Sequence, residues 1–203
     1  MNNIDSYTWS RIFSYFILFL GFISSIQAYS TREFNSRYNG IGIPALLLAL
    51  LIIVYMGLMP IGWGTANDRS NYAYVFLNIQ RNGLEAAYQN EKGFALINYI
   101  IGLFCNVTEY FIVVAAIYVS NYMAAIKRIT GKFNYWLLLA VILSMGFTSY
   151  NTNTMRAGLA ISFIVLGLSY YKNLCKMSCL LALSIFIHNS MIIPCGMILL
   201  SRF

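Results

Sequence analysis

Residues 133–171 read FNYWLLLAVILSMGFTSYNTNTMRAGLAISFIVLGLSYY and contain a single charged side chain, that of Arg156. A helix that crosses a hydrocarbon core about 30 Å thick needs roughly 20 consecutive apolar residues. The run is long enough for two such helices, and the polar residues near 150–154 mark a turn between them. The stretch therefore predicts two membrane-spanning helices, with Arg156 about one turn inside the second.

Composition extends this prediction to the whole chain. Apolar residues make up 60% of the 203 residues, charged residues make up 9%, and the mean hydropathy is +0.68. About a quarter of the residues in a soluble domain are charged, so this chain has too few for a water-soluble surface. Lys and Arg give a net charge of +7, but they are scattered between apolar runs. This scatter is typical of loop ends in membrane proteins and excludes a nucleic-acid-binding protein.

Other apolar runs extend the predicted bundle, and they cover residues 12–29, 41–61, 110–126 and 177–200. The piece at 93–107 is short for a full crossing, which predicts a re-entrant or interfacial helix and six spans in total. Seven spans are the alternative. Residues 62–92 are the most polar stretch, and we expect them to form an external loop. The predicted fold is all-α, with residues 1–203 forming a single transmembrane domain, a polytopic membrane helix bundle.

Two arguments about orientation oppose each other. Lys and Arg prefer cytoplasmic loops, and their count favours seven spans with a cytoplasmic N-terminus. Six spans with an external N-terminus instead place Asp68, Glu91 and Arg156 on the same, external side. We favour the second orientation because the segment 93–107 is short for a full crossing, and because only six spans place these three side chains on the same side of the membrane.

Arg156 is the strongest single candidate for a functional residue. An Arg at membrane depth costs about 3 kcal/mol on insertion scales, and the first turn of a helix is unfavourable for a cation. Its planar guanidinium binds two oxygens of a phosphate or pyrophosphate at once. The alternative is a side chain that merely reaches the lipid headgroups.

His188 is the only histidine, and it lies in the middle of the last apolar run, followed by Asn189 and Ser190. An imidazole in this position can act as a general base, donate a hydrogen bond to a ligand, or tether two helices. The sequence leaves these three roles open.

The polar stretch offers a second group of candidates. Asp68 and Arg69 precede the aromatic Tyr72. Carboxylates beside aromatic faces are common in sugar-binding sites, although a solvated charged loop is the alternative. Cys175 and Cys179 are one helical turn apart, but no His or carboxylate accompanies them, so we expect no metal.

Four short motifs follow one another in a fixed order. DRSNY (68–72) and EKGF (91–94) resemble the Asp-Tyr-x-x-Tyr and Glu-x-Gly-Phe signatures of the EpsG family. RAGLA (156–160) resembles that family's Arg-Gln-Gly-x-Ala, and FIHNSM (186–191) resembles its Phe-x-His-x-Ser-Ala. The family comprises Wzy-like polymerases of bacterial exopolysaccharide, capsule and O-antigen. Arg69 replaces the usual Tyr, Ala157 replaces the usual Gln, and the chain is shorter than typical members.

The resemblance implies that the protein joins lipid-linked oligosaccharide repeat units at the outer face of the bacterial inner (cytoplasmic) membrane. It would then be a multi-pass glycosyltransferase with an undecaprenyl-pyrophosphate donor, a lipid-linked acceptor, and neither metal nor cofactor. Its partners would be these substrates, membrane lipid and other polysaccharide-assembly proteins. The alternatives are a transporter (flippase) of lipid-linked glycans and an inactive, truncated remnant.

The chemistry of this reaction leads to a hypothesis about the roles of individual residues. Candidates for the base are Asp68, Glu91 and His188, and candidates for substrate binding are Arg156, Arg69, Tyr72 and Asn189. Charge on the departing pyrophosphate needs a cation, and the attacking hydroxyl needs a base. We assign the first role to Arg156, assisted by Arg69, and leave the three candidate bases unranked.

Overall fold

The computed structural model describes residues 6–30, 42–62, 68–83, 85 and 91–201, and within these ranges every regular element is helical. The elements are α1 Ser6–Ser30, α2 Gly42–Leu58, α3 Asp68–Asn82, α4 Lys92–Gly102, α5 Val107–Thr130, α6 Tyr135–Leu143, α7 Met145–Thr152, α8 Met155–Ser169, α9 Leu174–Ile187, the 3-10 helix η2 Asn189–Met191, and α10 Ile192–Leu200. The predicted all-α class is therefore confirmed.

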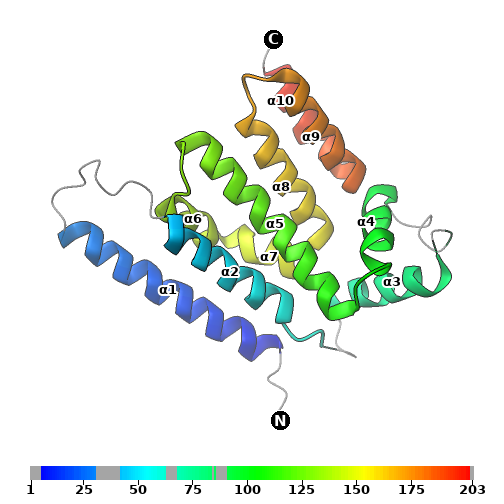
Figure 1. Cartoon of the computed structure of the whole chain (residues 1–203), viewed down its shortest axis with the longest axis horizontal. Coiled ribbons are helices and arrows are strands. Elements are labelled where there is room, and N and C mark those ends of the chain that lie inside the picture. The colour runs from blue at the N-terminus through cyan, green and yellow to red at the C-terminus, as the bar shows by residue number, and fades with distance from the viewer. Residues whose placement is uncertain (1–5, 31–41, 63–67, 84, 86–90, 202–203) are drawn as a thin grey trace.

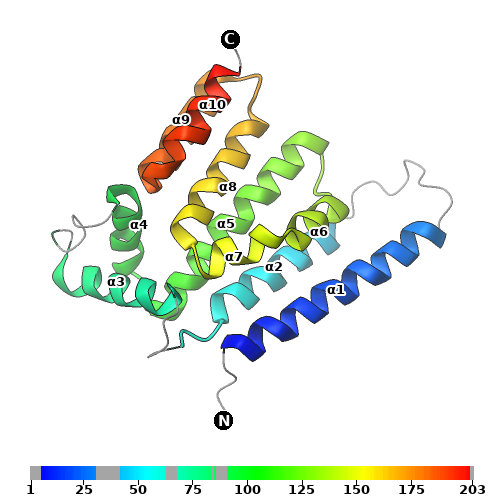
Figure 2. The same ribbon diagram turned by 180° about the vertical axis from the view of Figure 1, so that it is seen from behind.

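The helix α5 lies at the centre of the bundle. It packs against α2 on one side and α8 on the other, and α9 covers α8 (Figure 1). One apolar cluster joins α5 to α2 and α6 around Tyr118 and Tyr122. A second cluster joins α5 to α3, α4, α8 and α9 around Phe111 and Val114. The pair α3 and α4 thus packs at one end of the bundle, as the view from behind also shows (Figure 2).

The ends of α5 are set by local sequence signals. The Asn106 side chain accepts hydrogen bonds from the backbone N–H groups of Thr108 and Glu109, and the Glu109 side chain accepts one from the Asn106 N–H at 2.8 Å. This is a capping box, so the helix begins earlier than the span predicted at 110–126. Gly131 ends the helix with φ of 76°, a left-handed conformation that glycine adopts without steric cost.

Within the described residues, one helix, Val107–Thr130, is both long and apolar enough to cross a membrane alone. Shorter apolar helices cover Arg11–Ile23, Ile43–Leu58, Met155–Ser169, Leu174–Ile187 and Asn189–Leu200. The expected bundle of six spans is therefore not confirmed and remains a prediction.

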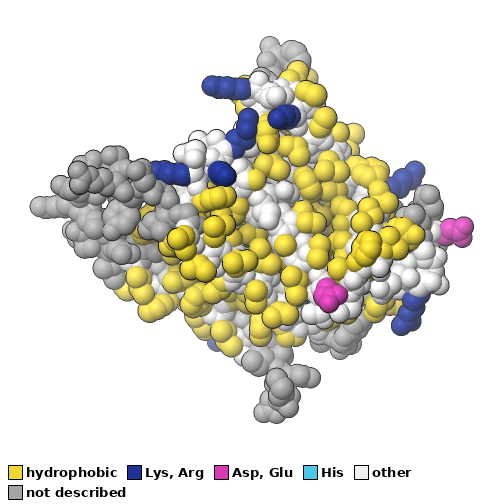
Figure 3. Space-filling view, viewed as in Figure 1, with side chains coloured by type: hydrophobic (Ala, Val, Ile, Leu, Met, Phe, Trp, Pro, Cys, Tyr) yellow, Lys and Arg dark blue, Asp and Glu magenta, His cyan; other side chains and the backbone are white. Residues whose placement is uncertain are grey.

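The outer faces of α1 and α2 carry an apolar surface. Phe22, Ile43 and Leu47 have exposed fractions of 65%, 73% and 60%. Soluble monomers rarely expose contiguous apolar patches of more than a few hundred Å². Figure 3 shows hydrophobic side chains over most of one face, with several Lys and Arg side chains toward the end where α5 finishes and α9 starts. This surface suits contact with lipid.

The prediction of one continuous helix over 177–200 is wrong. The helix α9 ends at Ile187, His188 is extended (φ −147°, ψ 110°), and α10 returns along α9 as a hairpin (Figures 1 and 2). Pro194 lies in the first turn of α10, where its missing N–H is harmless, whereas inside a continuous helix it would remove a hydrogen bond. His188 therefore lies at the tip of a hairpin rather than in the middle of a helix.

Two further expectations need correction. The span expected over 133–150 is divided at Ser144, which is extended and bonds its hydroxyl to the Val141 carbonyl at 2.6 Å. Serine competes in this way with the helical ladder. The polar stretch 62–92, expected to be a loop, contains α3, and Arg69, Ala73 and Phe76 lie on its buried face at helical spacing. The external location of this stretch remains a prediction.

Candidate functional site

Glu91, His188 and Arg156 come from three separate elements and meet at one point. Glu91 precedes α4 as its N-cap residue, His188 follows α9, and Arg156 is the second residue of α8. The His188 Nδ1 atom lies 2.6 Å from Glu91 Oε1, and an Arg156 terminal nitrogen lies 3.6 Å from Glu91 Oε2. The backbone N–H of Asn189 also donates to Glu91 Oε1 at 3.3 Å. Glu91 is thus the centre of the cluster.

A close approach of two backbones brings Glu91 to His188. Gly93, two residues after Glu91, packs directly against the backbone carbonyl of Phe186 in α9, and a Cβ at this position would overlap that carbonyl. Glycine permits such contact because it has no side chain. The glycine of the EKGF motif therefore serves to hold the start of α4 against the end of α9.

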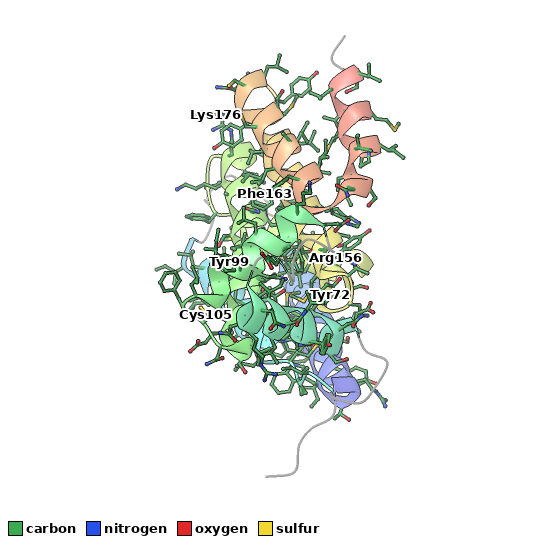
Figure 4. The ribbon with its side chains drawn as sticks, turned by 90° about the vertical axis from the view of Figure 1, so that its right-hand side faces the viewer. Tyr72, Tyr99, Cys105, Arg156, Phe163 and Lys176 are labelled. Carbon is green, nitrogen blue, oxygen red and sulfur yellow. The ribbon has the colours of Figure 1, made fainter. Side chains whose placement is uncertain are left out.

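A second glycine places Arg156 in the same way. Gly158, two residues after Arg156, packs against the backbone carbonyl of Tyr150 in α7. The first turn of α8 is thereby held against α7. The Arg156 guanidinium lies 5.9 Å from the centroid of the Tyr72 ring on α3, beside which it projects in Figure 4. The side chain is 39% exposed, so it can reach a ligand.

A cavity of about 240 Å³ opens beside the cluster. Its lining includes Asp68, Asn71 and Tyr72 from α3, Phe94 and Asn98 from α4, and Arg156 from α8. The Tyr72 and Phe94 rings meet edge to face, with centroids 5.8 Å apart. Arg156 belongs to both groups, so it connects the cavity with the pair of Glu91 and His188.

The charges at this point compensate one another. Glu91 lies at the N-terminus of α4, where the helix dipole favours a carboxylate. Arg156 lies at the N-terminus of α8, which disfavours a cation, and the adjacent Glu91 carboxylate offsets that penalty. An ionised carboxylate only accepts hydrogen bonds, so opposite an ionised Glu91 the His188 ring donates through Nδ1, and in the neutral imidazole Nε2 is then the accepting atom. The pair can therefore take up a proton at Nε2.

The structure brings together most, but not all, of the predicted site residues. Asp68 and Tyr72 line the cavity, whereas Glu91, His188 and the Asn189 backbone form the adjoining cluster. Arg69 lies elsewhere.

Arg69 is 1% exposed and faces away from the cavity. It donates to the Gly57 carbonyl at 2.8 Å, and its guanidinium stacks 3.8 Å from the centroid of the Phe111 ring. Burial lowers the pKa of the Arg69 guanidinium to about 10, so it stays charged at neutral pH. These contacts join α3 to α2 and α5, and they give no support to the predicted role of Arg69 in binding pyrophosphate.

Among the polar residues of the cavity, sequence reasoning missed three, Asn71, Asn98 and Thr154. Asn98 follows Glu91 by seven residues, which is two helical turns and hence the same face of α4. That spacing is the signal that could have found it. Within the described part of the chain, no group of three or more His, Cys, Asp or Glu side chains could hold a metal ion.

The helices expose an apolar surface that suits lipid. A carboxylate, an imidazole and a guanidinium meet at one end of the bundle. Together these features define a membrane protein with a polar site. The sequence model of the EpsG family matches residues 43–203, which is most of the chain. The chain belongs to the EpsG family, as its four motifs predicted, and is accordingly a membrane protein related to polysaccharide biosynthesis. No curated protein and no solved structure matches it.

Proposed function

We propose that the protein polymerises oligosaccharide repeat units linked to undecaprenyl pyrophosphate, by glycosyl transfer at the outer face of the bacterial cytoplasmic membrane. Its product would be an exopolysaccharide, capsule or O-antigen chain. The observation that carries the proposal is the placement of Glu91 between His188 and Arg156. A proton acceptor and a cation for an anionic leaving group are the two elements that transfer from a pyrophosphate donor requires.

The reaction has one bond-forming and one bond-breaking event. A hydroxyl oxygen of the acceptor sugar attacks the anomeric carbon of the donor, and the bond from that carbon to the pyrophosphate oxygen breaks. The pyrophosphate leaves with the bonding electrons, and Arg156 stabilises its added charge through a two-pronged contact. His188 Nε2 takes the hydroxyl proton. Glu91 stabilises the resulting imidazolium through the 2.6 Å contact with Nδ1.

Asp68 is the alternative base because it lines the cavity beside Arg156. The pair of His188 and Glu91 is the better candidate, since a carboxylate that orients an imidazole is the arrangement general bases commonly use. Glu91 is already engaged by His188, Arg156 and the Asn189 N–H, so its role is to position and stabilise rather than to accept the proton.

A transporter would be expected to present polar side chains near the middle of several helices. In the described parts of this chain, the site residues instead gather where α3, α4, α8 and α9 meet at one end of α5. Asn121 and Ser162 do lie near the middle of α5 and α8, but they hydrogen-bond to each other at 2.9 Å and tether the two helices, so the transporter is the second candidate.

The test is to delete the gene and restore it with variants, followed by measurement of surface polysaccharide chain length on a gel. Deletion should remove the polymer, and His188→Gln and Glu91→Gln should fail to restore it at normal protein levels. Glu109→Gln is the matched control, because Gln keeps the capping box of α5, and it should restore full length. Unchanged chain length on deletion would refute the proposal. Full activity of His188→Gln would transfer the role of base to Asp68.

A further inference from the structure

Asn98 on α4 is a fully buried amide. Its side chain is 0% exposed, and neither the amide nitrogen nor the amide oxygen has a hydrogen-bond partner among the described residues. Buried polar groups are nearly always paired, and an unpaired one requires an explanation. Asn98 lines the cavity beside Arg156, so a ligand in that cavity is the natural partner.

Asn121 shows what a structural amide looks like in the same protein. It is 9% exposed and donates to the Ser162 hydroxyl at 2.9 Å, which joins α5 to α8. Asn98 makes no equivalent bond within the described chain although it is more deeply buried. An interhelical tether therefore accounts for Asn121 and does not account for Asn98.

The chemistry of the amide limits what it can bind. Along one edge a primary amide presents an N–H donor beside its carbonyl acceptor, and this edge pairs best with a group that offers an acceptor and a donor at matching separation. Two adjacent hydroxyls of a sugar ring offer such a pair, because one can accept a hydrogen bond while the other donates one. The acetamido group of an amino sugar does not, because its trans amide directs N–H and C=O to opposite sides.

The remaining wall suits a sugar ring. Tyr72 and Phe94 supply aromatic surface for the apolar C–H face of the ring, and Asn71 adds a second amide. Small-molecule sites usually have volumes of roughly 300–1,000 Å³, so a cavity of about 240 Å³ has room for one ring and not for an oligosaccharide. Asn98 lies seven residues beyond Glu91, or roughly 10 Å along the axis of α4 at 1.5 Å per residue. The amide therefore contacts sugar away from the reacting atoms.

Building on the proposed polymerase function, we propose that Asn98 is a specificity-determining residue that binds a vicinal pair of hydroxyls on one sugar ring of the repeat unit, with Tyr72 and Phe94 packed against that ring. Asn98 has no part in proton transfer. It selects which lipid-linked glycan is positioned against Arg156, Glu91 and His188.

Binding is tested on the purified full chain in detergent by saturation-transfer NMR. The probes are methyl glycosides of glucose, galactose and mannose, and the comparison compound is tetrahydropyran-4-ol, a ring with a single hydroxyl. The wild type should transfer saturation to at least one glycoside and little to tetrahydropyran-4-ol, and Asn98→Leu should weaken that binding about tenfold or more, as expected for the loss of two hydrogen bonds. No transfer to any glycoside, equal transfer to tetrahydropyran-4-ol, or unchanged transfer in Asn98→Leu would overturn the inference.

Stability separates this role from a structural one. Asn98→Leu should keep or raise the melting temperature, because it removes an unpaired buried amide, whereas Asn121→Leu should lower it by breaking the bond to Ser162. Should Asn98→Leu fail to fold, Asn98→Ala adds no volume and serves in its place.

Polymer production in cells distinguishes failure of this inference from failure of the proposed function. If the wild type makes polymer and a stable Asn98→Leu variant makes the same amount and length, the inference is wrong and the polymerase proposal stands. If deletion of the gene leaves the polymer unchanged, the polymerase proposal fails, and with it the assignment of the ring to a repeat unit.

Discussion

The substitution Gly93→Ala tests whether the contact between α4 and α9 builds the site. The added Cβ would overlap the Phe186 carbonyl, which is backbone and cannot rotate away. The two helices must therefore separate, by about 1 Å for ordinary van der Waals contact. Overpacking of this kind costs about 1–3 kcal/mol. For a protein of 150–250 residues, 1 kcal/mol corresponds to roughly 2–4 °C in melting temperature, so we expect a fall of roughly 2–12 °C.

The same displacement acts on the pair of Glu91 and His188. Their contact of 2.6 Å would lengthen to about 3.6 Å, beyond the roughly 3.2 Å at which hydrogen bonds of this kind end. A misplacement of about 1 Å can reduce a rate about 100-fold, so polymer should be lost even where the protein remains folded.

The assay combines thermal unfolding in detergent with the surface polysaccharide gel. Gly196→Ala is the control, because an added Cβ in α10 meets nothing within 4 Å, and it should stabilise the protein by about 0.5–1 kcal/mol. Wild-type melting temperature and chain length in Gly93→Ala would refute the role that we give to this helix contact.

Three other predictions concern Arg156, Arg69 and the orientation of the protein in the membrane. Arg156→Lys keeps the charge but cannot make the two-pronged contact that we propose for the pyrophosphate, so polymer should fall strongly at normal protein levels on an immunoblot, and full activity would show that charge alone suffices. Arg69→Ala should lower the free energy of unfolding by about 2–4 kcal/mol, since it removes a charged hydrogen bond and a cation–π contact, while polymer per folded molecule stays unchanged; selective loss of polymer would return Arg69 to the site. The third prediction uses a chain whose native cysteines are replaced and a membrane-impermeant thiol reagent applied to cells. The reagent should label Tyr74→Cys on α3 and should not label Lys172→Cys at the opposite end of the bundle. The reverse pattern would place the site on the cytoplasmic side.

The helical class and most of the site could be predicted from the sequence because they depend on side-chain identity. Long uninterrupted apolar runs favour helices in a membrane, where every backbone group must be paired internally. Arg156 and His188 stand out because each is a polar residue in an apolar run. The resemblance of four ordered motifs then added Glu91, which the structure places at the centre of the cluster.

The sequence does not show where the chain turns back on itself or which face of a helix packs inward. Hydropathy does not distinguish a 24-residue span from two short helices that turn back, so the hairpin at His188 was missed, although Pro194 gave a signal. Arg69 and Asp68 are adjacent in sequence but lie on different faces of α3, and only the packing of that helix shows which one faces the cavity. Asn98 within an apolar run has the appearance of a tether until its lack of a partner among the described residues is seen.

The contact between His188 and Glu91 joins residues 97 positions apart in the chain. The imidazole reaches its carboxylate where α9 packs against α4, and α9 in turn packs on α8 and α8 on α5. Contacts between distant residues form late, since the intervening chain must first lose its freedom. Under the proposed function, a chain emerging from the ribosome would hold Asp68, Glu91 and Arg156 before His188, and the pair of His188 and Glu91 could form only after α9 had packed against α4.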